Sequence, residues 1–129
     1  MDFTQIKETC LYVMDLDKTK EFYHGLLKMP LLSHVADRHV FFRTGTSVLL
    51  CFNAEATRKE EQLPPHYASG KQHIAFEVKA EEYTTIKQEV IKSGITITHE
   101  QDWPEGFESF YFEDPDGHVL EIVPTGMWG

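Results

Sequence analysis

The sequence has few cysteines, few basic residues and no long apolar segment, and each shortage excludes a class of protein. Among 129 residues there are only two cysteines, Cys10 and Cys51, which form no CxxC motif. A disulfide framework is therefore excluded, and reduced thiols in a cytoplasmic protein are expected. The N-terminus lacks the basic and apolar regions of a secretory signal, and no apolar run approaches the roughly 18 residues that span a bilayer.

Basic residues are outnumbered by acidic ones. The chain has 12 lysines and arginines against 21 aspartates and glutamates, which gives a formal net charge of −9. Non-specific binding to nucleic acid or to an anionic membrane requires positive potential, so neither partner is expected. The apolar fraction of 41% is ordinary for a globular protein, and the length suits one domain or two small modules that share a core.

The chain repeats one pattern of elements. Hydrophobic alternation and turn residues predict a strand, a helix and three strands in each half, which is a βαβββ order. In the first copy the strands are expected at 8–13, 31–35, 40–43 and 48–52, with a helix from Asp15 or Asp17 to about Lys28. In the second they are expected at 73–78, 95–99, 109–113 and 118–123, with a helix over 81–93.

An internal repeat of this size indicates two units that complete one structure. We expect module one at about residues 1–55, module two at about 73–129, and a connecting loop at about 54–72, which is rich in charge and contains Pro64-Pro65. The predicted fold class is α+β, with the two modules forming an open, cup-shaped barrel.

The segment from Ser109 to Ile122 is the most informative part of the sequence. Asp114-Pro-Asp-Gly117 is typical of a turn, because proline restricts φ and glycine tolerates positive φ. On the returning strand, Glu121 shares a face with Val119 and Val123. A carboxylate among valines needs a compensating partner, since burying an unpaired charge is costly.

Superposing the two copies brings candidate partners to Glu121. Glu8 and His73 both begin an opening strand, and counting from the turn glycines places Leu49 at the position of Glu121. Glu8, His73 and Glu121 could therefore converge inside the cup. Two carboxylates and an imidazole suit Zn, Mn or Fe, with Ni or Co as further options, and three protein ligands leave open positions for substrate.

These motifs resemble the vicinal-oxygen-chelate superfamily, which includes glyoxalases, bleomycin-resistance proteins, extradiol dioxygenases and fosfomycin-resistance thiol transferases. The similarity is carried by Leu11-Tyr-Val-Met-Asp15, by Phe22-Tyr23, by His73-x-x-Phe-x-Val78 and by the segment Ser109–Glu121. It covers nearly the whole chain. The resemblance implies paired βαβββ modules, a divalent metal that chelates substrate oxygens, and frequent dimerisation.

The resemblance also assigns roles to individual residues. His73 and Glu121 match metal-ligand positions, Glu8 stands where many members have histidine, and Leu49 stands where four-ligand members have an acid or amide. Each residue has a plainer reading: Glu8 as a surface carboxylate, His73 as an interior histidine, and Glu121 as the partner of a basic residue in a member that has lost its metal. Glu121 or Glu8 would be the catalytic base.

A further set of residues is predicted to line the substrate pocket: Cys10, Tyr12, Leu49, Cys51, Trp103, Ser109 and Tyr111. Ser109 and Tyr111 belong to the Ser-Phe-Tyr-Phe strand, which resembles the corresponding strand of the thiol transferases. Fosfomycin resistance itself is disfavoured, because the sequence stops at Gly129 without the basic C-terminal segment of those enzymes.

The leading functional hypothesis is a divalent-metal-dependent lyase, isomerase or transferase of the glyoxalase type that acts on a small molecule. One alternative is a non-catalytic protein that sequesters a ligand, as bleomycin-resistance proteins do. A second is an extradiol-type dioxygenase, although only His73 supplies a histidine at a ligand position. A homodimer is the expected assembly.

Overall fold

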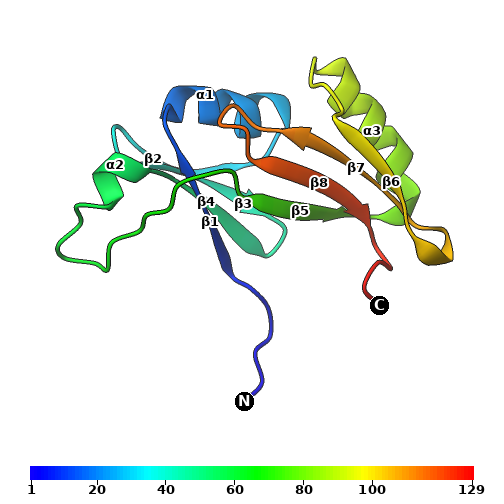
Figure 1. Cartoon of the computed structure of the whole chain (residues 1–129), viewed down its shortest axis with the longest axis horizontal. Coiled ribbons are helices and arrows are strands. Elements are labelled where there is room, and N and C mark those ends of the chain that lie inside the picture. The colour runs from blue at the N-terminus through cyan, green and yellow to red at the C-terminus, as the bar shows by residue number, and fades with distance from the viewer. The chain divides into compact units, whose positions relative to one another are not determined.

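The computed structural model describes residues 1–129 and divides into two units, residues 1–70 and 71–129. Each unit is built on a four-stranded mixed sheet (Figure 1). The strand order is β1-β4-β3-β2 in the first unit and β5-β8-β7-β6 in the second. The predicted α+β class with two βαβββ modules is confirmed. No helix is long and apolar enough to cross a membrane.

The first unit follows the predicted order of elements. Its strands are β1 (Glu8–Val13), β2 (Leu31–Val35), β3 (His39–Thr44) and β4 (Ser47–Asn53). Its helices are α1 (Leu16–Lys20), the π-helical turn η1 (Glu21–Leu26) and α2 (Ala54–Thr57).

The first helix begins where the sequence predicts. The carboxylate of Asp15 accepts a hydrogen bond from the backbone N–H of Lys18 at 3.0 Å and caps α1. A regular helix to Lys28 was expected, but the chain widens into η1 after Lys20. The short helix α2 was not expected either. It forms because the Asn53 side chain accepts from the N–H groups of Glu55 and Ala56, which a predicted loop over 54–72 did not anticipate.

The core of the first unit lies between its sheet and the α1–η1 helix. Leu11, Val40, Phe42 and Cys51 are all almost completely buried there, and the Tyr23 ring packs 5.4 Å from Phe42. The opposite face of the sheet carries Glu8, Cys10 and Tyr12 from β1 and their cross-strand partners Val48, Leu50 and Phe52 from β4.

The second unit has β5 (His73–Val78), β6 (His99–Asp102), β7 (Glu108–Glu113) and β8 (Val119–Pro124). Its helices are η2 (Ala80–Glu82), α3 (Tyr83–Lys92) and η3 (Pro104–Gly106). The second strand of this unit, β6, starts at His99 rather than Ile95, because only Thr98 of the preceding segment bonds to β7, through Tyr111 O at 2.8 Å. Figure 1 shows α3 beside β7 and β6, and its Tyr83 ring meets Phe110 at 5.6 Å.

Candidate metal site

In the second unit, the face of the sheet opposite α3 carries a cluster of polar side chains. Strand register places His73 and Ala75 of β5, Glu121 of β8, Ser109 and Tyr111 of β7, and His99 of β6 on this face. We call it the site face. Along the strands, residues of the site face alternate with residues that are buried on the α3 side, because strands have a two-residue period. These buried residues are Phe110, Phe112, Leu120 and Ile122.

His73 and Glu121 lie together on the site face. The imidazole Nε2 of His73 is 3.3 Å from Oε1 of Glu121. Nδ1 of the same ring is 2.8 Å from the backbone oxygen of Val119. Because a carbonyl oxygen only accepts, Nδ1 must carry a hydrogen and donate it.

This arrangement fits a metal. With the hydrogen on Nδ1, the lone pair of Nε2 faces a carboxylate oxygen, and two lone pairs at 3.3 Å require a proton or a cation between them. A ligating histidine that donates its other N–H to a backbone carbonyl is the usual arrangement in metal sites. The half-exposed side chain of His73 also leaves the pair accessible from solvent.

Tyr111 completes the surroundings of Glu121. It is the cross-strand partner of Glu121, and its ring lies 6.0 Å from that of His73 and 5.5 Å from that of His99. Burial, together with hydrogen bonding to Glu121 and its negative charge, raises the pKa of the Tyr111 phenol. The phenol is therefore neutral at physiological pH and donates to the carboxylate.

Trp103 and Ser109 are joined beside this cluster. The indole Nε1 donates to the Ser109 hydroxyl at 2.9 Å, and Ser109 is 1% exposed while Trp103 is 37% exposed. The loop after Trp103 turns through Glu105 and Gly106, both with positive φ, and closes where Trp103 N–H donates to Phe107 O. The exposed part of the indole thus has a defined position.

The third predicted ligand, Glu8, belongs to the first unit, where it is exposed at the start of β1. The structure gathers no group of three or more histidine, cysteine, aspartate or glutamate side chains that could hold a metal. Glu8 lies on one face of β1 with Cys10 and Tyr12. Burial and the charge of Glu8 raise the pKa of the Cys10 thiol, so Cys10 is a neutral thiol. The place of Glu8 in a metal site stays a prediction.

Leu49 and Cys51 do not line the same face as Glu8, and their assignment to the pocket was wrong. They are the partners of Thr9 and Leu11 and are 1% and 0% exposed in the core under α1. The error came from counting between turn glycines. Cys10 pairs with Leu50 as Ala75 pairs with Glu121, so Leu50 is the counterpart of Glu121.

The different turn lengths of the two hairpins explain why this count was wrong by one residue. In the first, Thr44 pairs with Ser47 across a tight turn, whereas in the second Glu113 pairs with Val119 across the longer Asp114–His118 segment. Gly45 therefore lies five residues before Leu50, whereas Gly117 lies four residues before Glu121. His118, at the end of the second turn, is buried and its Nδ1 accepts from the N–H of Gln72 at 3.0 Å.

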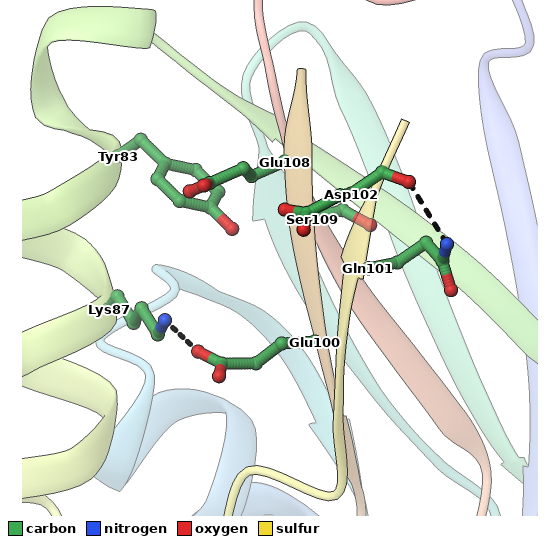
Figure 2. Close-up of a pocket in the computed structure, with 7 residues that line it drawn as sticks. All are labelled: Tyr83, Lys87, Glu100, Gln101, Asp102, Glu108 and Ser109. Atoms are coloured by element: carbon green, nitrogen blue, oxygen red, sulfur yellow. Dashed lines mark hydrogen bonds and ion pairs between the residues drawn. The ribbon is translucent and has the colours of Figure 1, made fainter. Parts of the chain in front are cut away.

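The sequence did not reveal a polar pocket on the α3 side of the second unit. It has a volume of about 230 Å³ and is lined by Tyr83, Lys87, Glu100, Gln101, Asp102, Glu108 and Ser109. Figure 2 shows Tyr83 and Lys87 of α3 directed toward the acidic side chains of β6 and β7. Burial and the charges of Glu108, Glu121 and Asp102 raise the pKa of Tyr83 to about 12. No sequence pattern signals this pocket, because its residues come from three segments of the chain that local periodicity does not bring together.

The comparisons with known proteins agree with the resemblance. The model of the Glyoxalase/Bleomycin resistance protein/Dioxygenase superfamily matches residues 5–122. The chain belongs to this superfamily.

Two relatives in the superfamily carry transferase names. Glutathione transferase FosA of Serratia marcescens is 36% identical over 112 residues, covering 87% of this chain and 74% of that protein. Metallothiol transferase FosB of Staphylococcus epidermidis is 27% identical over 125 residues, covering 95% and 82%. A solved structure of lactoylglutathione lyase from Agrobacterium tumefaciens superposes with a TM-score of 0.93 at 29% identity, covering 99% of this chain and 98% of that one.

Proposed function

We propose that this superfamily member is a divalent-metal-dependent transferase that joins a small thiol to an electrophilic, oxygen-bearing substrate. The observation that carries the proposal is the His73–Glu121 pair, in which Val119 directs the imidazole lone pair toward the carboxylate. The transferase names of relatives that align with most of this chain support the reaction type.

The donor types indicate which metals are suitable. An imidazole nitrogen and a carboxylate oxygen suit Zn, Mn or Fe, and Ni and Co also accept this pair. Glu8 is the proposed third ligand. When bound, the metal would supply a Lewis acid that withdraws electrons from a substrate oxygen.

The protein side chains would hold and orient the reactants. His73 and Glu121 provide two donor atoms, and the Tyr111 phenol donates to Glu121 and so restricts the orientation of that carboxylate. In the reaction a carbon–sulfur bond forms while a carbon–oxygen bond of the electrophile breaks. The thiol proton ends on the released oxygen, and Glu121 or Glu8 is the proposed carrier of that proton.

The exposed side of the Trp103 indole is the proposed contact for the apolar part of the substrate. Its hydrogen bond to the buried Ser109 holds the ring in place before any ligand arrives. A ring that is already positioned loses little conformational freedom on binding, which favours affinity.

The test begins with protein purified without a histidine tag and assayed for bound metal. The metal-loaded protein is then given glutathione with two epoxides, fosfomycin and an uncharged aromatic epoxide, and with a chlorodinitrobenzene as a control that has no carbon–oxygen bond to open. The proposal expects about one metal per chain and thiol consumption that chelator abolishes and metal restores. No metal binding from Zn, Mn, Fe, Ni or Co would overturn it, as would binding without any thiol transfer.

A second candidate function is sequestration of an aromatic cation, which the exposed, fixed indole of Trp103 favours. Aromatic faces attract cations, and the chain is acidic overall. A thermal-shift screen separates the two functions. A large stabilisation by aromatic cations with none by divalent metals would favour sequestration.

A further inference from the structure

His39 is a buried histidine in the first unit that has no part in the proposed reaction. It begins β3 with 6% of its surface exposed. Its ring is stacked on Phe41, with centroids 3.8 Å apart and planes 11° from parallel, and it meets the edge of Phe52 at 6.1 Å. A ring this enclosed must satisfy both of its nitrogens within the protein.

The partners of His39 select one neutral form of the ring. Arg38 Nη1 lies 2.5 Å from Nδ1 of His39. A guanidinium only donates hydrogen bonds, so Nδ1 must be the unprotonated acceptor. Nε2, 2.9 Å from the Ser33 hydroxyl of β2, therefore carries the hydrogen and donates it. The histidine is neutral in this arrangement.

Arg38 connects the histidine to the segment that follows α2. Its other terminal nitrogen, Nη2, forms a 2.8 Å ion pair with Glu60, and both side chains are partly buried. The guanidinium also lies 5.5 Å from the centre of the Phe52 ring. Arg38 is thus held between a neutral imidazole and a carboxylate, over an aromatic ring.

Residues 58–67 form a strap that folds back on itself. The Thr57 hydroxyl donates to His66 O at 2.5 Å, and the His66 ring packs 5.3 Å from Phe52. The strap therefore meets the Arg38–Phe52 region through Glu60 and through His66.

We propose that His39 is a pH-sensitive latch whose protonation releases the strap from Arg38 and uncovers Phe52. Protonation at Nδ1 removes the acceptor of Arg38 and places a second positive charge next to the guanidinium. Arg38 must then move, and Glu60 loses the orientation of its partner.

Burial and the neighbouring positive charges shift the pKa of His39 in the same direction. Burial, Arg38 and His34 each lower the pKa of His39. Its folded-state pKa thus lies below the ordinary value of 6.5, so the stability gained from the neutral ring is present above pH 6.5 and is lost as pH falls through the folded-state value. Glu60 is the one carboxylate linked to this group, through Arg38. His66 is the other titratable side chain of the strap that contacts this region, through its packing on Phe52.

Hydrogen–deuterium exchange of the full chain between pH 7.5 and 5, corrected for intrinsic exchange rates, tests the latch. The expected result is at least a tenfold loss of protection in residues 58–67 of the wild type, with residues 83–92 of α3 unchanged. His39→Gln, which keeps a neutral donor and acceptor, should remove the pH dependence, and the exposed control His24→Gln should retain it. Protection that is independent of pH in the wild type, or equally dependent in His39→Gln, would overturn the proposal.

A second measurement does not depend on any variant folding. Long-range ¹H–¹⁵N NMR spectra of the wild type report the tautomer and titration of each imidazole. We expect His39 to carry its hydrogen on Nε2 at pH 7.5, and to titrate with the same midpoint as the opening of the strap. A hydrogen on Nδ1, or a titration unconnected with the exchange of residues 58–67, would contradict the latch.

Discussion

The backbone oxygen of Val119 accepts a hydrogen bond from His73 Nδ1 at 2.8 Å, and this contact turns Nε2 of the ring toward Glu121. His73 and Val119 are also register partners between β5 and β8. The pairing of two strands therefore sets the orientation of a side chain, so that the His73–Glu121 pair forms as a consequence of folding.

His73→Ala should lower metal affinity by about 100-fold or more, since loss of a ligand should cost at least as much as the roughly 10–100-fold lost with its supporting groups. Isothermal titration calorimetry with Zn and Mn gives the constants. His24→Ala, which removes an exposed histidine of the first unit, is the control and should bind as the wild type does. Equal affinity for both variants would exclude His73 as a ligand.

Tyr111→Phe should keep the ring contacts with His73 and His99 but remove the phenol that donates to Glu121. Metal affinity or thiol transfer should fall about 10–100-fold, as it does when a supporting hydrogen bond to a ligand is lost. Tyr67→Phe, on an exposed residue of the first unit, is the matched control. If metal affinity and thiol transfer are unchanged in Tyr111→Phe, the Glu121 carboxylate does not depend on this hydrogen bond.

Trp103 can be followed by its own fluorescence in a Trp128→Phe background, because these are the two tryptophans of the chain. Binding of an aromatic electrophile should quench or shift the emission. Ser109→Ala should raise KM about 3- to 10-fold with little change in kcat, since one hydrogen bond worth about 1 kcal/mol holds the indole. A change confined to kcat would instead assign Ser109 a part in the chemical step.

Tyr83 should make stability depend on pH in the alkaline range. Its folded-state pKa of about 12 lies above the ordinary value of 10.0, so the neutral phenol contributes stability below pH 10 that is lost as pH rises from 10 to about 12. Denaturant titrations between pH 9 and 12 should show this loss in the wild type and a smaller one in Tyr83→Phe. Identical profiles would show that neither burial nor the nearby carboxylates raise the pKa of the Tyr83 phenol.

Gly117→Ala should destabilise the second unit by about 1–2 kcal/mol, the typical cost of a left-handed conformation for a residue with a side chain. Gly117 has φ of 82°, and an added Cβ would lie 2.9 Å from Lys71 Cε. Gly45→Ala is the control, because φ is also positive there but no atom lies within 4 Å. Equal losses in the two variants would assign the whole effect to backbone conformation.

The sequence predicted elements well and the register between elements less well. The strand from 73 to 78, the Asp15 cap and the face of Glu121 follow from local alternation and capping chemistry, which depend on neighbouring residues only. The placement of Leu49 depended on the lengths of two turns relative to their strands, and a difference of one residue moved it to the opposite face. The Arg38–His39–Glu60 connection joins residues far apart in the chain, and no local pattern contains that information.

The turn after β7 has a consequence beyond its own stability. The carboxylate of Asp114 accepts from the N–H groups of both Asp116 and His118 at 2.9 Å, and so fixes how many residues separate Glu113 from Val119. Because strand faces alternate, a turn shorter or longer by one residue would point Leu120 or Ile122 at the histidine and bury Glu121 against Phe110. Asp114 lies seven positions before Glu121 in the sequence. By fixing the length of the turn, it determines whether β8 places a carboxylate or an apolar side chain next to the imidazole of His73.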